Sequence, residues 1–218
     1  MAPPLNERVS RRTFLKSAGK WVAGTFFSAI SLHSYAKHVE PNWFDVQRFD
    51  ISHPLIPKGF HRFTILQFSD THLGFHFSLK RFEKVLKMIN REKPDLIVFS
   101  GDLVDNLLSF PYINECIFML SSINAPYGKF AVYGNHDHGG WGTEKYRDMM
   151  RLSGFKLLQN ENALIEKDNS AIAIAGIDDA ILGKPDFHKT FRGIDKELFT
   201  ILISHAPDLA DIAKEYTV

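Results

Sequence analysis

Four short apolar runs recur along the chain, and each leads directly into polar residues. They occupy residues 63–70, 95–102, 129–137 and 199–207, with the sequences FTILQFSD, DLIVFSGD, KFAVYGNHD and FTILISHAP. Runs of roughly four to eight β-branched, aromatic and aliphatic residues bounded by polar residues are typical of buried strands. The pattern therefore predicts four strands, each followed by a polar loop.

Segments with helical periodicity lie between these strands. One apolar face is marked by Leu79, Phe82, Val85, Leu86 and Ile89, and a second by Tyr146, Met149, Met150 and Phe155. Apolar residues at such spacings predict amphipathic helices packed on a core. Residues 162–177 instead predict two strands around the turn KDNS, which adds a hairpin to a mixed sheet. This alternation of strands and helices indicates an α/β protein.

The composition indicates a single folded domain and argues against nucleic acid as its partner. The 218 residues are 44% hydrophobic, which is enough for one domain with a substantial core. Lys plus Arg number 26 against 25 Asp plus Glu, and this near-neutral charge argues against nucleic acid as a partner. The single cysteine, Cys116, follows helical spacing with Ile113, Ile117 and Leu120, so we expect a small buried side chain rather than a nucleophile.

The N-terminal residues have the features of an export signal. Paired Arg11 and Arg12 precede an apolar stretch from Trp21 to Leu32, and the small residues Ser34 and Ala36 suit cleavage after Ala36. An arginine pair, an apolar stretch and a small-residue cleavage site, in this order, are typical of a twin-arginine signal. The apolar stretch is shorter than the ~20 residues that a membrane-spanning helix needs.

We therefore expect residues 1–36 to be a signal read by the twin-arginine export machinery, and residues 37–218 to form the mature domain. The expected location is the periplasm, the cell wall or the extracellular space, with membrane association if the signal is not cleaved. The cell envelope is then a further expected partner. A basic N-terminal helix and an uncleaved membrane anchor are the alternatives for this segment.

The polar residues after the strands carry metal-binding and proton-transferring groups. They are Asp70 and His72 in SDTHLG, Asp102 and Asp105 in SGDLVD, Asn135, His136 and Asp137 in GNHD, and His205 in SHAP. Functional residues of open α/β sheets gather at the carboxyl ends of the strands, so we expect these side chains to converge. Carboxylate, imidazole and amide groups without thiolates suit Zn, Mn or Fe. Taken singly, each residue has an ordinary explanation as a turn, a helix cap or a hydrogen-bonded histidine.

The order Asp-x-His, Gly-Asp-x-x-Asp, Gly-Asn-His-Asp and His resembles the calcineurin-like metallophosphoesterase superfamily. The resemblance runs from about Phe63 to the end of the chain, and the export signal adds a likeness to twin-arginine-exported bacterial phosphodiesterases. It implies a four-layer αββα sandwich with mixed sheets. It also implies a dinuclear metal-dependent phosphoric ester hydrolase of the phosphodiesterase class, which cleaves a phosphate-ester substrate by attack of a metal-bridging hydroxide.

The resemblance assigns a role to each matching residue. Two divalent metal ions (Mn, Zn or Fe) would be held by Asp70 and His72 at the first position, Asn135 and His205 at the second, and Asp102 between them. His136 would donate a proton to the leaving oxygen, and Asp105 would orient its ring. Asp137 would support the same loop. His138 and His76 are interpreted as solvent-exposed loop histidines.

The family's Gly-His-x-His motif does not occur before Val218, where the chain stops. The metallophosphoesterase domain of residues 37–218 is therefore expected to be C-terminally incomplete, without its last strands and with one ligand missing at each metal. Residues 207–218 are interpreted as the helix before the next strand.

Three explanations for the missing motif stay open: a truncated chain, a shortened inactive relative, or a vacancy filled by water or a partner. Two functional alternatives stay open as well. One is a pyrophosphohydrolase of lipid-linked nucleotide sugars, which an exposed apolar helix or loop near the site would favour. The other is a catalytically inactive, truncated metal-binding domain.

Overall fold

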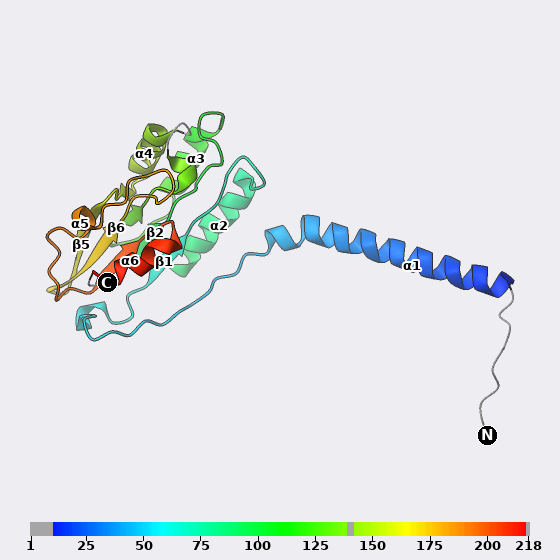
Figure 1. Cartoon of the computed structure of the whole chain (residues 1–218), viewed down its shortest axis with the longest axis horizontal. Coiled ribbons are helices and arrows are strands. Elements are labelled where there is room, and N and C mark those ends of the chain that lie inside the picture. The colour runs from blue at the N-terminus through cyan, green and yellow to red at the C-terminus, as the bar shows by residue number, and fades with distance from the viewer. Residues whose placement is uncertain (1–10, 139–141, 217–218) are drawn as a thin grey trace, which may run out of the picture. The chain divides into compact units, whose positions relative to one another are not determined.

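The computed structural model describes residues 11–138 and 142–216 (Figure 1). The chain divides into two units, Met1–Phe49 and Asp50–Val218. The first unit contains helix α1 (Arg11–His38), none of whose residues is buried, and a short 3-10 turn, η1 (Glu40–Asn42). Within the described residues, no helix combines the length and the apolar character needed to cross a bilayer.

The second unit contains two sheets. The first is parallel, in the order β1 (Ile65–Phe68), β2 (Leu96–Phe99), β3 (Lys129–Ala131) and β4 (Lys156–Leu157). The second has the order β5 (Glu161–Lys167), β6 (Ser170–Gly176) and β7 (Thr200–Ile203). Strands β5 and β6 form the predicted antiparallel hairpin, while β6 and β7 are parallel, so this sheet is mixed.

Helices follow the strands in the expected alternation. They are α2 (Leu79–Glu92), α3 (Ile113–Ser121), α4 (Thr143–Leu152), α5 (Phe187–Thr190) and α6 (Ala210–Ala213), with 3-10 turns η2 (Lys58–Phe60), η3 (Asn135–Asp137) and η5 (Pro207–Leu209). Ser78 begins α2 as an N-cap that accepts a hydrogen bond from Arg81 N. Cys116 is fully buried on α3, as its spacing predicts.

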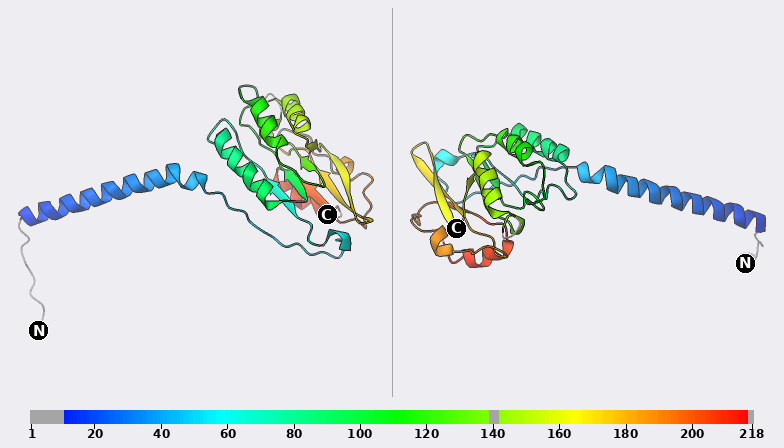
Figure 2. Two further views of the ribbon diagram at one scale, coloured as in Figure 1. Left: turned by 180° about the vertical axis from the view of Figure 1, so that it is seen from behind. Right: turned by 90° about the horizontal axis from the view of Figure 1, so that it is seen from above.

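Three apolar clusters hold the second unit together. The first joins α2, α3 and α4 to one face of the parallel sheet through residues such as Phe82, Phe99 and Met150. The second fills the space between the two sheets, with Val98 and Ile174 among its members. The third packs α5 and α6 on the outer side of the mixed sheet. Figure 2 shows α2 and α3 on one side of the unit and α5 and α6 on the opposite side.

The structure corrects three details of the predicted elements. Strand β1 is not buried: it forms an edge of its sheet, and Ile65 is 38% exposed. Strand β4 was not predicted, because two residues are too few to show a period. Residues 207–216 form a 3-10 turn and one short helix rather than a single helix, and residues 217–218 lie outside the described residues.

Candidate metal centre

The loops after β1 and β2 run side by side at the carboxyl ends of their strands. Asp70 N donates to Gly101 O at 3.0 Å, and His72 N donates to Asp102 O at 3.1 Å. Asp70, His72 and Asp102 all have left-handed backbone angles, with φ of 53°, 39° and 58°. Such angles are uncommon outside glycine, and they gather at functional sites where the surrounding structure holds them in place.

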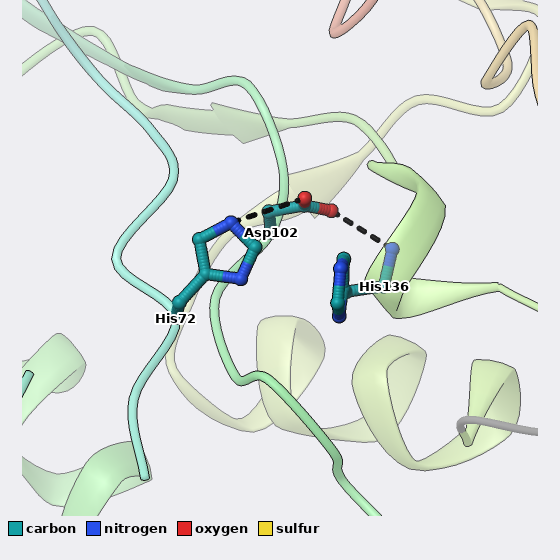
Figure 3. A group of neighbouring side chains, drawn as sticks. All are labelled: His72, Asp102 and His136. Atoms are coloured by element: carbon teal, nitrogen blue, oxygen red, sulfur yellow. Dashed lines mark hydrogen bonds and ion pairs between the residues drawn. The ribbon is translucent and has the colours of Figure 1, made fainter. Parts of the chain in front are cut away.

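The buried carboxylate of Asp102 lies at the centre of the cluster. Its Oδ1 accepts a hydrogen bond from His136 N at 2.9 Å. Its Oδ2 lies 3.4 Å from His72 Nε2 and 3.6 Å from His205 Nε2. Figure 3 shows the carboxylate between His72 and His136, with one oxygen directed toward each residue. Asp102 Oδ2 therefore faces the imidazoles of both His72, which follows β1 of the parallel sheet, and His205, which follows β7 of the mixed sheet.

These separations fit cations between the side chains. Two ligand atoms that bind one ion at about 2.1 Å lie roughly 3.0–3.4 Å apart. Among the described residues, two groups have ligand atoms mutually within 4.8 Å. One is His72, Asp102 and His136, and the other is Asp70, Asp102 and His205. Asp102 belongs to both groups, so its carboxylate is placed to be shared by two cations. The residues present therefore fit a metal pair.

Asn135 joins the second group. Its Oδ1 lies 3.3 Å from His205 Nε2. The other ring nitrogen of His205, Nδ1, donates to Ser100 O at 2.9 Å. Because a carbonyl only accepts, this bond places the ring proton on Nδ1 and leaves the Nε2 lone pair directed at the site. His205 is thus prepared as a ligand in the tautomer that a cation requires.

Asp105 contacts His136 through its main chain. His136 Nδ1 donates to Asp105 O at 2.8 Å, whereas Asp105 Oδ1 is 3.8 Å from the same nitrogen. The Asp105 carboxylate also lies 3.7 Å from His72 Nδ1, and the His72 and His136 rings meet edge to face with centroids 4.7 Å apart. Asp105 and His136 are therefore neighbours, as predicted, but the main-chain carbonyl of Asp105 rather than its carboxylate makes the short contact.

Asp137 ties the loops after β2 and β3 together. Its side chain is fully buried and accepts hydrogen bonds from Asp102 N, Leu103 N and Gly134 N at 2.7, 3.3 and 2.9 Å. Burial raises the pKa of this carboxyl to about 7, against the lowering effect of the three N–H donors. The expected supporting role of Asp137 thus has a clear structural basis.

The interpretation of His138 as an exposed loop residue is wrong. Its ring is buried, and Nε2 lies 2.5 Å from Oδ1 of Asp178 in the loop that follows β6. His76 is exposed, as expected. Sequence reasoning missed Asp178, although the apolar run AIAIAGI before it is the same kind of signal that marks the other strand ends.

The chain is similar in sequence to known phosphoesterases. The model of the calcineurin-like phosphoesterase family matches residues 63–213. The uncharacterized metallophosphoesterase YkuE of Bacillus subtilis is 41% identical over 97% of this chain and 74% of its own length. Phosphodiesterase YaeI of Escherichia coli is 26% identical over 95% of this chain and 73% of its own. UDP-2,3-diacylglucosamine pyrophosphatase LpxG of Chlamydia muridarum is 24% identical over 84% and 68%.

The chain belongs to the calcineurin-like phosphoesterase family. With this membership come metallophosphoesterase activity and a phosphate-ester substrate, and the cluster of His and Asp side chains is the candidate metal site.

Proposed function

We propose that the protein is a dinuclear phosphodiesterase that acts outside the cytoplasm. The observation that carries the dinuclear site is the position of Asp102 Oδ2, which faces His72 and His205 at similar distances. Asp70 and His72, whose Oδ1 and Nε2 atoms are 3.9 Å apart, would hold one divalent cation, Asn135 and His205 the other, and Asp102 both; Asp70 also lies within the group of Asp102 and His205. Carboxylate, imidazole and amide ligands suit Mn, Zn or Fe. When bound, two such cations supply hydroxide at neutral pH and neutralise charge on the phosphate.

The proton donor in this proposal is His136. Its Nδ1–H donates to the Asp105 carbonyl, which fixes the ring, and in the imidazolium form Nε2 carries a second proton that it would give to the leaving oxygen. Its proximity to His72 and Asp102 would also allow it to bind a cation. Replacing His136 with Gln separates these roles. If His136 is only the proton donor, turnover falls while both cations still bind; if it is a ligand, cation binding falls as well.

Hydrolysis of model esters tests the proposed activity. The full chain, loaded with manganese, is assayed with bis(p-nitrophenyl) phosphate and with p-nitrophenyl phosphate, and bound metal is counted per chain. We expect the parent chain to bind two cations and to hydrolyse the diester faster than the monoester. Asp102→Asn should lose both the binding of two cations and the diester turnover. Diester turnover that survives Asp102→Asn would overturn the proposal. Metal binding without turnover of either ester would favour an inactive metal-binding domain.

Export by the twin-arginine machinery is the second part of the proposal. Its support is the sequence of α1, which carries Arg11 and Arg12 in its first turn and no acidic residue. Replacing both arginines with Lys and comparing the cytoplasmic and external fractions of cells tests it. We expect the variant to stay inside. Equal export of both forms would argue for the alternatives, a basic helix or a membrane anchor.

Exposed apolar side chains near the site favour a second candidate, a pyrophosphohydrolase of lipid-linked nucleotide sugars. Phe75 and Leu108 are 66% and 58% exposed, and each lies three residues after a site residue, His72 and Asp105. The two loops touch, since Leu73 pairs with Val104. LpxG, a relative, is named as a UDP-2,3-diacylglucosamine pyrophosphatase. Turnover of that compound, weakened by Phe75→Ser with Leu108→Ser while the model diester is still cleaved, would support this candidate.

We also infer the four-layer αββα arrangement for the second unit. The three apolar clusters support it, because each lies between two successive layers: helices, parallel sheet, mixed sheet, helices. The arrangement matters for function because site residues come from both sheets, Asp102 after β2 and His205 after β7.

A further inference from the structure

The imidazole of His138 is buried directly after the η3 turn and meets a carboxylate that follows the other sheet. His138 Nε2 lies 2.5 Å from Asp178 Oδ1, and the two side chains are 7% and 4% exposed. The ring also packs on Tyr133, with centroids 4.3 Å apart and planes inclined by 31°. These contacts give His138 one orientation, with its ring nitrogen directed at Asp178.

Asp178 is itself held firmly. Its Oδ2 accepts hydrogen bonds from Lys184 N at 2.9 Å and Gln159 Nε2 at 3.1 Å, and its Oδ1 accepts a further one from Asp179 N at 3.0 Å. Its own N–H donates to Asn160 Oδ1 at 3.0 Å. With the carboxylate fixed in this way, Asp178 is a rigid acceptor in the loop that follows β6 of the mixed sheet.

The η3 turn is held from both sheets. Asp137, its last residue, accepts from Gly134 N before the turn and from Asp102 N in the loop after β2 of the parallel sheet. At its end, the main-chain bond from His138 N to Asn135 O is long, at 3.4 Å. The short side-chain bond from His138 to Asp178 therefore holds this end to the mixed sheet.

We propose that His138 and Asp178 form a positioning pair that fixes Asn135 and His136 at the metal centre. This inference rests on the proposed function, because it takes Asn135 as a cation ligand and His136 as the proton donor. Both members of the pair are buried, so they act through the turn rather than on the substrate. Without the pair, the end of the turn loses its link to the sheet from which His205 comes, and Asn135 and His205 no longer approach one cation together.

The test compares His138→Leu with His138→Gln in the full chain. Gln can place an N–H donor close to the position of His Nε2, whereas Leu fills the space without a donor. Residues that orient metal ligands typically contribute about 10–100-fold to metal affinity or activity. We expect His138→Leu to weaken the second manganese binding event by about tenfold or more in calorimetry, and to lower kcat more than it raises KM. His138→Gln should recover most of both.

A control variant separates positioning from simple stabilisation. Ile165→Ala removes buried side-chain volume from the core between the sheets, and the described members of that apolar cluster include no site residue. It should therefore lower Tm while manganese affinity and kcat stay within about twofold. The proposal is overturned if His138→Leu behaves like this control, with Tm alone reduced. It is also overturned if His138→Gln is no better than His138→Leu.

Two further variants keep the test decisive. Should His138→Leu fail to fold, Asp178→Asn takes its place, and it should weaken the second manganese site while His138→Gln remains active. Asp102→Asn reports on the proposed function separately. If Asp102→Asn retains turnover, the proposed function fails. If Asp102→Asn is inactive while Asp178→Asn binds two cations and hydrolyses the diester like the parent chain, only the positioning pair fails.

Discussion

At the residue scale, the ring of His136 is oriented by a main-chain atom. Its Nδ1 bonds to the carbonyl of Asp105 at 2.8 Å, and the carboxylate is too distant for a hydrogen bond. We therefore expect Asp105→Asn, which keeps the carbonyl, to lower kcat less than tenfold. His136→Gln should lower it by about a hundredfold or more, because proton donation is lost. Steady-state kinetics on the diester measures kcat for both variants. Equal losses of kcat in Asp105→Asn and His136→Gln would show that the Asp105 carboxylate orients the ring.

Asp178 makes a second prediction at this scale, concerning acid stability. Burial raises the pKa of Asp178, but hydrogen bonds from His138, Lys184 N and Gln159 outweigh it and bring the pKa to about 2, from 3.8. The pKa of Asp178 is lower in the folded chain than in the unfolded chain, so its ionised carboxylate stabilises the fold. This contribution to the free energy of unfolding is fully present above pH ~4 and is lost as the pH falls toward ~2. Its full size is about 2 kcal/mol.

Urea unfolding at several pH values between about 4.5 and 3 measures this contribution. The free energy of unfolding should fall less steeply with decreasing pH in Asp178→Asn than in the parent chain, since the variant has no carboxyl at this position to titrate. Parallel curves for the two proteins would contradict the prediction.

At the element scale, the loops after β2 and β3 approach so closely that glycine is required. A Cβ on Gly134 would lie 2.2 Å from Asp102 Oδ1 and 2.7 Å from Asp102 N, and one on Gly101 would lie 2.4 Å from Gly134 N. Gly134→Ala must therefore displace Asp102 or move the turn. We expect it to abolish diester turnover and to weaken manganese binding by at least tenfold.

The matched control is Gly193→Ala. Gly193 has a φ of 82° but open space around it, so the substitution costs about 1 kcal/mol of stability through backbone strain and leaves turnover unchanged. Turnover in Gly134→Ala equal to that of this control would show that the loops separate without consequence for the site.

At the scale of the whole molecule, sequence patterns captured the elements better than the contacts between them. The alternation of apolar runs placed β1, β2, β3 and β7, and the 3.6-residue period placed α2 and α4, because both signals are local. His138 and Asp178 are 40 residues apart, and no local period shows that they meet. The exposure of Ile65 also depends on the absence of a paired strand on one side of β1 within the described residues, which the composition of the strand does not encode.

The site joins the two sheets, so cation binding should stabilise the fold. Asp102 follows the parallel sheet and His205 the mixed sheet, and Asp102 Oδ2 lies 3.6 Å from His205 Nε2. In the unfolded chain these ligands are far apart, so a cation binds the folded form selectively. At a concentration about a hundred times Kd, this adds about 2.7 kcal/mol, or roughly 5–10 °C in Tm. Thermal unfolding with manganese and with excess chelator measures the difference, and Asp102→Asn should remove most of it. A Tm that chelation leaves unchanged would mean that no cation links the two sheets.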